Sequence, residues 1–168
     1  MNSGDLRKLW KQIVAGKTHG WEPGIAFEYL VLRAFELEGA KVQYSFPVRL
    51  SSGINEQIDG VVYVDDLSAV VESKDRDQID VEPIAKLRNQ LPRRPSAAIG
   101  VVFSRGGFTP PARALAQFLA PQTILLWDGD EIDFAMRRHT MCDGLRFKYE
   151  KAIEMGVPDF NLRTQEMP

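Results

Sequence analysis

The sequence predicts an α/β sandwich in which a central mixed β-sheet is flanked by helices. Three observations favour this class: two helical patterns precede three β segments, helices and strands then alternate, and the later strands are continuously apolar. Continuous apolar runs are typical of strands buried on both faces, and amphipathic helices bury their apolar stripes against such a sheet.

Two amphipathic helices are expected at the start of the chain. Ser3 can cap the first helix, which Gly16 stops, and Pro23 opens a second helix that ends at Gly39. The apolar stripe of the first helix contains Leu6, Leu9, Trp10, Ile13 and Val14.

Three β segments are expected next, because apolar and polar side chains alternate there. Asp65 and Asp66 form the turn between the second segment and the third. The segments run from Val42 to Pro47, from about 57 to 64 and from about 68 to 74.

Helices and strands alternate in the remainder of the chain. Asp80 caps one helix, whose stripe contains Ile84, Leu87, Arg88 and Leu91, and Thr109 with Pro110 starts another. Buried strands at 97–103 and 122–127, a short helix after Asp128 and an amphipathic helix at 145–155 complete the predicted order.

The 168 residues are expected to form a single domain, 1–168. Within it we expect a core at about 20–135, a helical extension at about 144–156 and a mobile tail at 158–168. The N-terminus has no apolar signal segment, and the apolar runs are too short to cross a bilayer. A cytoplasmic protein without membrane association is therefore expected.

Charge and cysteine content limit the classes of function. A net charge of -2 counts against a tight nonspecific nucleic-acid binder, but it allows a nuclease, because a basic rim and bound cations can offset acidic ligands. The single cysteine, Cys142, permits no intrachain disulfide and has no thiol-hydrolase context.

Four polar residues stand out in apolar surroundings. Glu28 shares a helix face with apolar residues, Asp59 lies inside a strand, and Glu72 and Lys74 occupy one face at the end of the next strand. Gly60, after Asp59, lets the backbone bend or be approached closely. Taken singly, each feature also fits an edge glutamate, a strand-start aspartate or a solvated ion pair.

Together these residues suggest a metal site. The thirteen residues from Asp59 to Glu72 fit an antiparallel hairpin that brings the two carboxylates side by side. Converging carboxylates repel one another unless a hard cation such as Mg²⁺ lies between them.

The order Glu28, Asp59, Glu72-x-Lys74 resembles the signature of the PD-(D/E)XK nuclease superfamily, and most closely its type IV, Mrr-like restriction endonuclease domains. The likeness covers roughly residues 20 to 135. It is carried by the segments Ala26-Phe27-Glu28, Ile58 to Val62, Val71 to Asp75, Gly100 to Ser104 with Phe108, Thr109 and Ala112, and Leu125 to Gly129.

The resemblance implies a restriction-endonuclease-like sandwich and a DNA endonuclease that uses Mg²⁺ or Mn²⁺. Asp59 and Glu72 would hold the metal, with Glu28 as a further ligand, and Lys74 would orient the attacking water or stabilise the developing charge. Candidates for DNA backbone contacts are Arg76, Arg93, Arg94, Arg105, Arg137 and Arg138, and Gln90 is a candidate accessory residue.

Two departures from the family pattern affect these expectations. Many Mrr-like domains carry Gln where this chain has Glu72, and Glu favours a competent metal site. The chain has no room for a separate DNA-reading domain, so target selection is expected from the domain itself, a homodimer or a separate target-recognition partner.

Two other functions stay open at this point. One is a catalytically inactive nucleic-acid-binding or scaffold domain that kept the nuclease fold, against which the complete set of four residues argues. The other is a repair, junction or toxin nuclease, which the sequence does not separate from a restriction or defence enzyme.

Overall fold

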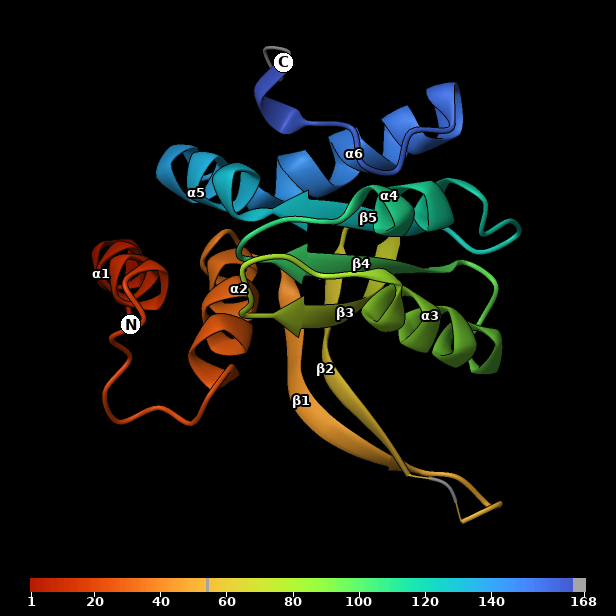
Figure 1. The fold of residues 1–168 in the computed structure, drawn as a ribbon, viewed down its shortest axis with the longest axis horizontal. Coiled ribbons are helices and arrows are strands. Elements are labelled where there is room, and N and C mark those ends of the chain that lie inside the picture. Colours follow the sequence, from red (N-terminus) through yellow and green to blue (C-terminus); the bar gives the residue numbers. More distant parts are fainter. Residues whose placement is uncertain (54, 165–168) are drawn as a thin grey trace.

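The computed structural model describes residues 1–53 and 55–164. A mixed five-stranded sheet with the strand order β1-β2-β3-β4-β5 forms the centre of the molecule (Figure 1). Its strands are β1 (Lys41–Arg49), β2 (Asn55–Val64), β3 (Leu67–Lys74), β4 (Ala98–Ser104) and β5 (Ile124–Asp128). The α/β fold class expected from the sequence is confirmed.

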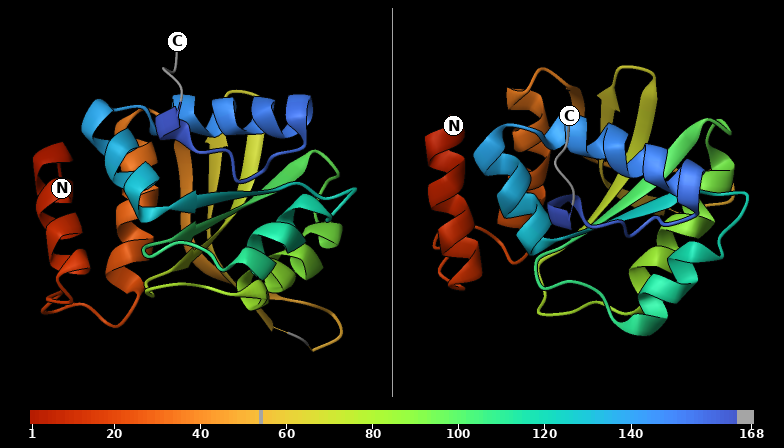
Figure 2. Two further views of the ribbon diagram at one scale, coloured as in Figure 1. Left: turned by 45° about the horizontal axis from the view of Figure 1, so that its top comes forward. Right: turned by 90° about the horizontal axis from the view of Figure 1, so that it is seen from above.

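Helices cover both faces of the sheet (Figure 2). One apolar core lies between the sheet and the helices α1 (Ser3–Val14), α2 (Ile25–Leu37), α5 (Gly129–Arg138) and α6 (Met141–Met155). A second core lies under α3 (Val81–Gln90) and α4 (Pro110–Gln117), with the short 3-10 helix η1 (Leu91–Arg93) beside them.

The sheet changes from antiparallel to parallel at β3. The strands β1, β2 and β3 pair antiparallel, whereas β3, β4 and β5 pair parallel. In the parallel part, Lys74, Ser104 and Asp128 are register partners at the strand ends. The carboxyl ends of three strands therefore meet at one edge of the sheet, where ligand sites of open α/β sheets form.

The starts of the first two helices differ from the sequence prediction. Asn2, rather than Ser3, caps α1, because its side chain accepts from Asp5 N–H while the Asp5 carboxylate accepts from Asn2 N–H. The predicted stripe is buried except for Val14, which is 56% exposed. Helix α2 begins at Ile25, after Gly24 in the left-handed conformation, two residues beyond the predicted Pro23.

Two capping and burial predictions also need correction near α3. Asp80 is the N-cap residue, but its carboxylate accepts from the Thr109 hydroxyl at 2.7 Å instead of from its own helix. This bond ties the start of α3 to the start of α4. Arg88, predicted on the apolar stripe, is exposed.

The last part of the chain packs against the core. Helix α6 begins at Met141, four residues before the predicted start, and is followed by the 3-10 helix η2 (Leu162–Thr164). Leu126 N–H donates to the Pro158 carbonyl at 3.0 Å, and Leu162 is fully buried. Residues 158–164 thus contact the core, and the mobility expected of the tail stays a prediction; 165–168 lie outside the described residues.

A buried ion pair fastens this segment. Lys148 of α6 is fully buried, and its Nζ lies 2.5 Å from Glu131 Oε1 and donates to the Phe160 carbonyl at 2.5 Å. The same Glu131 oxygen accepts from Leu162 N–H at 2.9 Å. Across the described residues, no helix combines the length and the apolar character needed to span a membrane.

Candidate active site

The carboxyl end of β3 carries a buried carboxylate that two lysines bind. Glu72 is 1% exposed and shares a sheet face with Lys74. Lys74 Nζ lies 2.6 Å from Glu72 Oε1, and Lys86 Nζ, from α3, lies 2.6 Å from Glu72 Oε2. Both oxygens of Glu72 have an ammonium partner, which offsets the cost of burying the charge.

Asp59 joins this cluster from β2. Because Gly60 is paired with Val71, Asp59 lies next to Glu72 across the two strands. Asp59 Oδ2 accepts a 2.9 Å hydrogen bond from Ser73 N–H and lies 3.7 Å from Lys74 Nζ. One ammonium group thus contacts the carboxylates of both strands.

The charge state of Lys74 follows from these neighbours. Burial opposes its charged form, but the hydrogen bond to Glu72 and the attraction of Glu72, Asp59 and Glu28 outweigh burial and raise the pKa of Lys74 above its usual value. Lys74 is therefore an ammonium ion at neutral pH. It can stabilise negative charge but cannot accept a proton.

Glu28 belongs to the same electrostatic cluster. It lies in the first turn of α2 and is half-buried. Burial raises the pKa of Glu28 to about 7, and the charges of Asp59 and Glu72 add to the increase while Lys74 opposes it. A carboxyl group with this pKa is partly protonated at neutral pH, so Glu28 adds only part of a negative charge to the cluster.

Gly60 allows α2 to reach the sheet. A Cβ atom at this position would lie 2.6 Å from Leu32 Cδ2 and 3.1 Å from the Gln43 carbonyl oxygen. The close approach predicted from the sequence therefore comes from the helix that carries Glu28. Glycine at this position helps to set the distance between Glu28 and the strand acids.

The donor set fits a hard divalent cation. Asp59, Glu72 and Glu28 supply carboxylate oxygens, which Mg²⁺ and Mn²⁺ prefer. Glu72 Oε1 is buried and has an ion-pair partner but no hydrogen-bond partner. In the part of the chain that is described, the acids are not arranged as a preformed group of three ligands. The oxygens of Glu72 and Asp59 are instead bound by the lysines and by Ser73 N–H.

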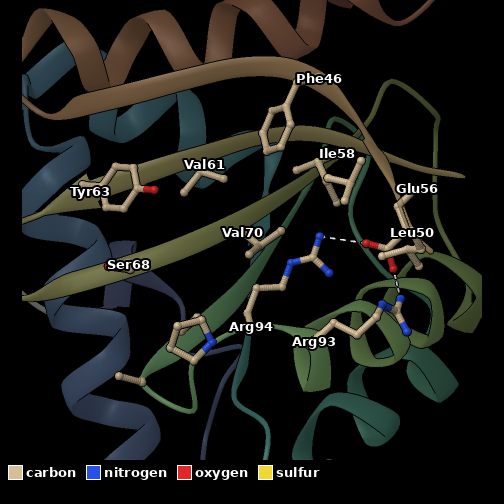
Figure 3. A pocket seen from close by; sticks show the side chains of 14 residues that line it. Phe46, Leu50, Glu56, Ile58, Val61, Tyr63, Ser68, Val70, Arg93 and Arg94 are labelled. Atoms are coloured by element: carbon tan, nitrogen blue, oxygen red, sulfur yellow. Dashed lines mark hydrogen bonds and ion pairs between the residues drawn. The ribbon is translucent and has the colours of Figure 1, made fainter.

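Two of the arginines predicted to contact DNA lie elsewhere. Arg93 and Arg94 both pair with the carboxylate of Glu56, the latter at 2.8 Å. Figure 3 shows these side chains in a cavity of about 420 Å³ that is lined mainly by apolar residues of β1, β2 and β3. This cavity shares no lining residue with the acidic cluster.

The other predicted contacts are dispersed. Arg105 pairs with Asp75 at 2.5 Å and with Asp77 at 2.9 Å, next to the end of β3. Arg76 is exposed beside it. On α5, Arg137 pairs with Asp133 at 2.9 Å and the guanidinium of Arg138 stacks on Phe134, which leaves both groups at the surface.

The sequence interpretation missed Lys86. It named Gln90 as the residue of α3 that faces the site, but Gln90 is buried one turn farther on, where its amide lies 3.5 Å from the Gln57 carbonyl. Residues four apart lie on the same helix face. Because Gln90 was predicted to face the site, the same spacing also predicts that Lys86 faces it.

A family match and one solved structure agree with this architecture. The restriction endonuclease family Mrr_cat matches residues 22–136. No curated protein matches the chain. The small subunit of the heterodimeric restriction endonuclease R.BspD6I superposes with a TM-score of 0.61 and 15% identity, over 94% of this chain and 91% of that one. The restriction endonuclease MspJI, solved with a 27-mer oligonucleotide, gives a TM-score of 0.44 and 19% identity over 95% of this chain and 36% of its own.

Proposed function

Because the chain belongs to the Mrr_cat restriction endonuclease family, we propose that it is a metal-dependent endonuclease that hydrolyses phosphodiester bonds in DNA. The observation that carries the proposal is the contact of Lys74 with both Glu72 and Asp59 at the edge where three parallel strands end. A role in restriction or defence is part of the proposal.

Each residue has a distinct role in this reaction. Asp59 and Glu72, with Glu28 as a further ligand, would hold Mg²⁺ or Mn²⁺. When bound, the cation supplies Lewis-acid stabilisation of the charge that develops on the phosphate. Lys74, which is charged at neutral pH, stabilises the same charge from the protein side.

Burial makes this arrangement effective. Asp59 and Glu72 are 5% and 1% exposed, so water screens their interactions with the ammonium group only weakly. Ser73 N–H fixes the orientation of the Asp59 carboxylate. The strand acids are thereby preorganised on a rigid part of the sheet, which is how enzymes hold charged groups for a transition state.

A single centre cleaves one strand at a time. Double-strand cleavage would require a second catalytic domain, from a homodimer or from another subunit, and target choice would come from that partner or from the surface of this domain.

Plasmid cleavage tests the proposal. The purified protein is expected to cut DNA with Mg²⁺ or Mn²⁺ and to stop when a chelator is added. Lys74→Ala and Asp59→Asn should each lower the rate on the order of 10²- to 10³-fold. Matched controls are Lys41→Ala and Asp66→Asn, which change exposed residues of the same types and should cut like the parent.

The alternative is a nucleic-acid-binding domain without catalysis. It is favoured by one observation, the occupation of both Glu72 oxygens by Lys74 and Lys86. DNA binding with no cleavage under either metal would support it. Equal cleavage by the parent and by Lys74→Ala would show that the assigned residues are not the catalytic ones.

A further inference from the structure

A basic groove lies between α1 and α5, outside the acidic cluster. Its volume is about 730 Å³, and its lining includes Arg7, Lys8 and Lys11 of α1 and Arg137 of α5. Asp133 is the acidic residue among the lining residues. The basic residues of α1 precede the segment that matches the restriction endonuclease family, 22–136, whereas Asp133 lies inside it.

The cations of α1 have no acidic partner. Arg7, Lys8 and Lys11 are exposed, and within residues 1–53 and 55–164 none of them forms an ion pair, whereas Arg137 pairs with Asp133. Spacings of three and four residues place Lys11 beside both Lys8 and Arg7 on the helix surface. A chain with a net charge of -2 therefore concentrates uncompensated positive charge on one helix.

Helix α1, which lines the groove, packs against α2, the helix that carries Glu28. Arg33, near the end of α2, donates to the Met1 carbonyl at 3.1 Å, so α1 and α2 run in opposite directions and Lys11 lies toward the start of α2. The ring of Trp10 lies 6.3 Å from that of Phe27, the neighbour of Glu28. Figure 2 shows α1 beside α2 and α5.

Trp10 also connects the groove to the sheet edge. A Cβ atom on Gly129 would lie 3.3 Å from the Trp10 ring, and Gly129 directly follows Asp128, the last residue of β5. Asp128 is paired through Ser104 with Lys74. The basic groove and the acidic cluster thus lie at the same edge of the molecule.

The occupant that fits is a phosphate polymer. Leu6, Leu9 and Ile13 of α1 are buried in the core, and of its large aliphatic side chains Val14 stays exposed, so the helix lacks the broad apolar face that membrane insertion needs. Rows of lysine and arginine without acidic partners bind phosphates by releasing condensed counterions. We infer that the α1–α5 groove binds the sugar-phosphate backbone of duplex DNA beside the bond that is cut, an inference that rests on the proposed function.

DNA binding measured at several salt concentrations tests this inference. Fluorescence anisotropy with a labelled duplex gives the Kd for DNA. It is measured at several KCl concentrations from about 50 to 200 mM, with a chelator present to prevent cleavage. The variant is R7Q/K8Q/K11Q, in which glutamine keeps the helix propensity. The control is K41Q/R88Q/K151Q, which removes three positive charges from β1, α3 and α6, none of which lines the groove.

The expected result is specific to the groove variant. Its Kd should rise on the order of tenfold, and the slope of log K against log salt should fall by about 2 to 3, since each phosphate contact contributes about 0.9. The control variant should retain the parent slope. Circular dichroism should show that both variants are folded.

Other outcomes overturn the inference in distinguishable ways. If both triple variants bind DNA equally, while the parent still cuts plasmid with Mn²⁺, the groove assignment is wrong and the proposed function stands. If the parent neither binds nor cuts DNA, both fail. If the parent binds vesicles containing phosphatidylglycerol through these residues more tightly than it binds DNA, the groove recognises lipid headgroups instead.

Discussion

Replacing Lys148 by methionine tests the buried ion pair between α5 and α6. The substitution keeps the length of the side chain but removes the ammonium group that binds Glu131 and the Phe160 carbonyl, each at 2.5 Å. Glu131 would keep two backbone hydrogen bonds, from Asp128 N–H at 3.0 Å and Leu162 N–H at 2.9 Å. Its carboxylate would nevertheless be left buried without a counter-ion.

The expected loss is large because the pair is shielded from water. Removing one partner of a buried pair costs about 3–5 kcal/mol, and the two remaining hydrogen bonds place this case near the lower end. Burial raises the pKa of Glu131 and lowers that of Lys148, so desolvation outweighs their mutual attraction. A second change, Glu131→Gln, removes the stranded charge and should recover about 1–2 kcal/mol.

The direction of the pH dependence follows from Glu131. In Lys148→Met the pKa of Glu131 in the folded protein should rise further. The stability of this variant is then retained below pH 4.5, the pKa of the carboxyl group in the unfolded chain, and is lost as the pH rises through the pKa of Glu131 in the folded protein. Urea denaturation at pH 5 and pH 8 should therefore show a larger loss at pH 8. The matched control is Lys151→Met, one turn away, whose partner Glu154 is exposed. It should cost less than about 1 kcal/mol.

Two results would refute this reasoning. A loss in Lys148→Met no larger than in Lys151→Met would mean that the buried pair contributes nothing specific. A double variant, Lys148→Met with Glu131→Gln, that is less stable than the single Lys148 variant would mean that the unpaired charge is not the source of the loss.

Three further predictions concern the candidate active site. Lys86→Met frees one oxygen of Glu72 and should tighten Mn²⁺ binding about fivefold by calorimetry, whereas unchanged or weaker binding would contradict it. Burial above all raises the pKa of Glu28 to about 7, so the metal-free parent loses stability as the pH rises from 4.5 to 7. In urea titrations above pH 7, Glu28→Gln should be more stable than the parent by about 1 kcal/mol, a value reduced to allow for the half exposure of Glu28. Near pH 4 the two proteins should be equally stable. Gly60→Ala should cost about 1–3 kcal/mol in urea denaturation because its Cβ would meet Leu32, and a neutral effect would show that α2 shifts freely.

The strand predictions succeeded where periodicity carries direct geometric meaning. Side chains two apart on a strand must share a face, which predicted the common orientation of Glu72 and Lys74. A tight turn between antiparallel strands fixes their register, so the chain distance from Asp59 to Glu72 placed these residues side by side. Both statements depend only on local backbone geometry.

The contacts of long side chains were not predictable in this way. Lys86, Arg93 and Arg94 reach their carboxylate partners across elements, and which partner they reach depends on helix rotation and packing. Lys148 is a sharper example, because a lysine among charged residues of a helix predicts a solvated face, yet its ammonium is fully buried. Pairing with Glu131 overrides the preference that the sequence expresses locally.

Helices α1 and α6 close one face of the sheet although both lie outside the family-matched residues 22–136. Leu6, Ile13, Leu145 and Leu162 fill the same core as the central strands. Melting either end would wet that core, so both ends should unfold together with the sheet in one cooperative transition. The family-matched segment therefore depends for its own stability on residues of this chain that lie outside the match.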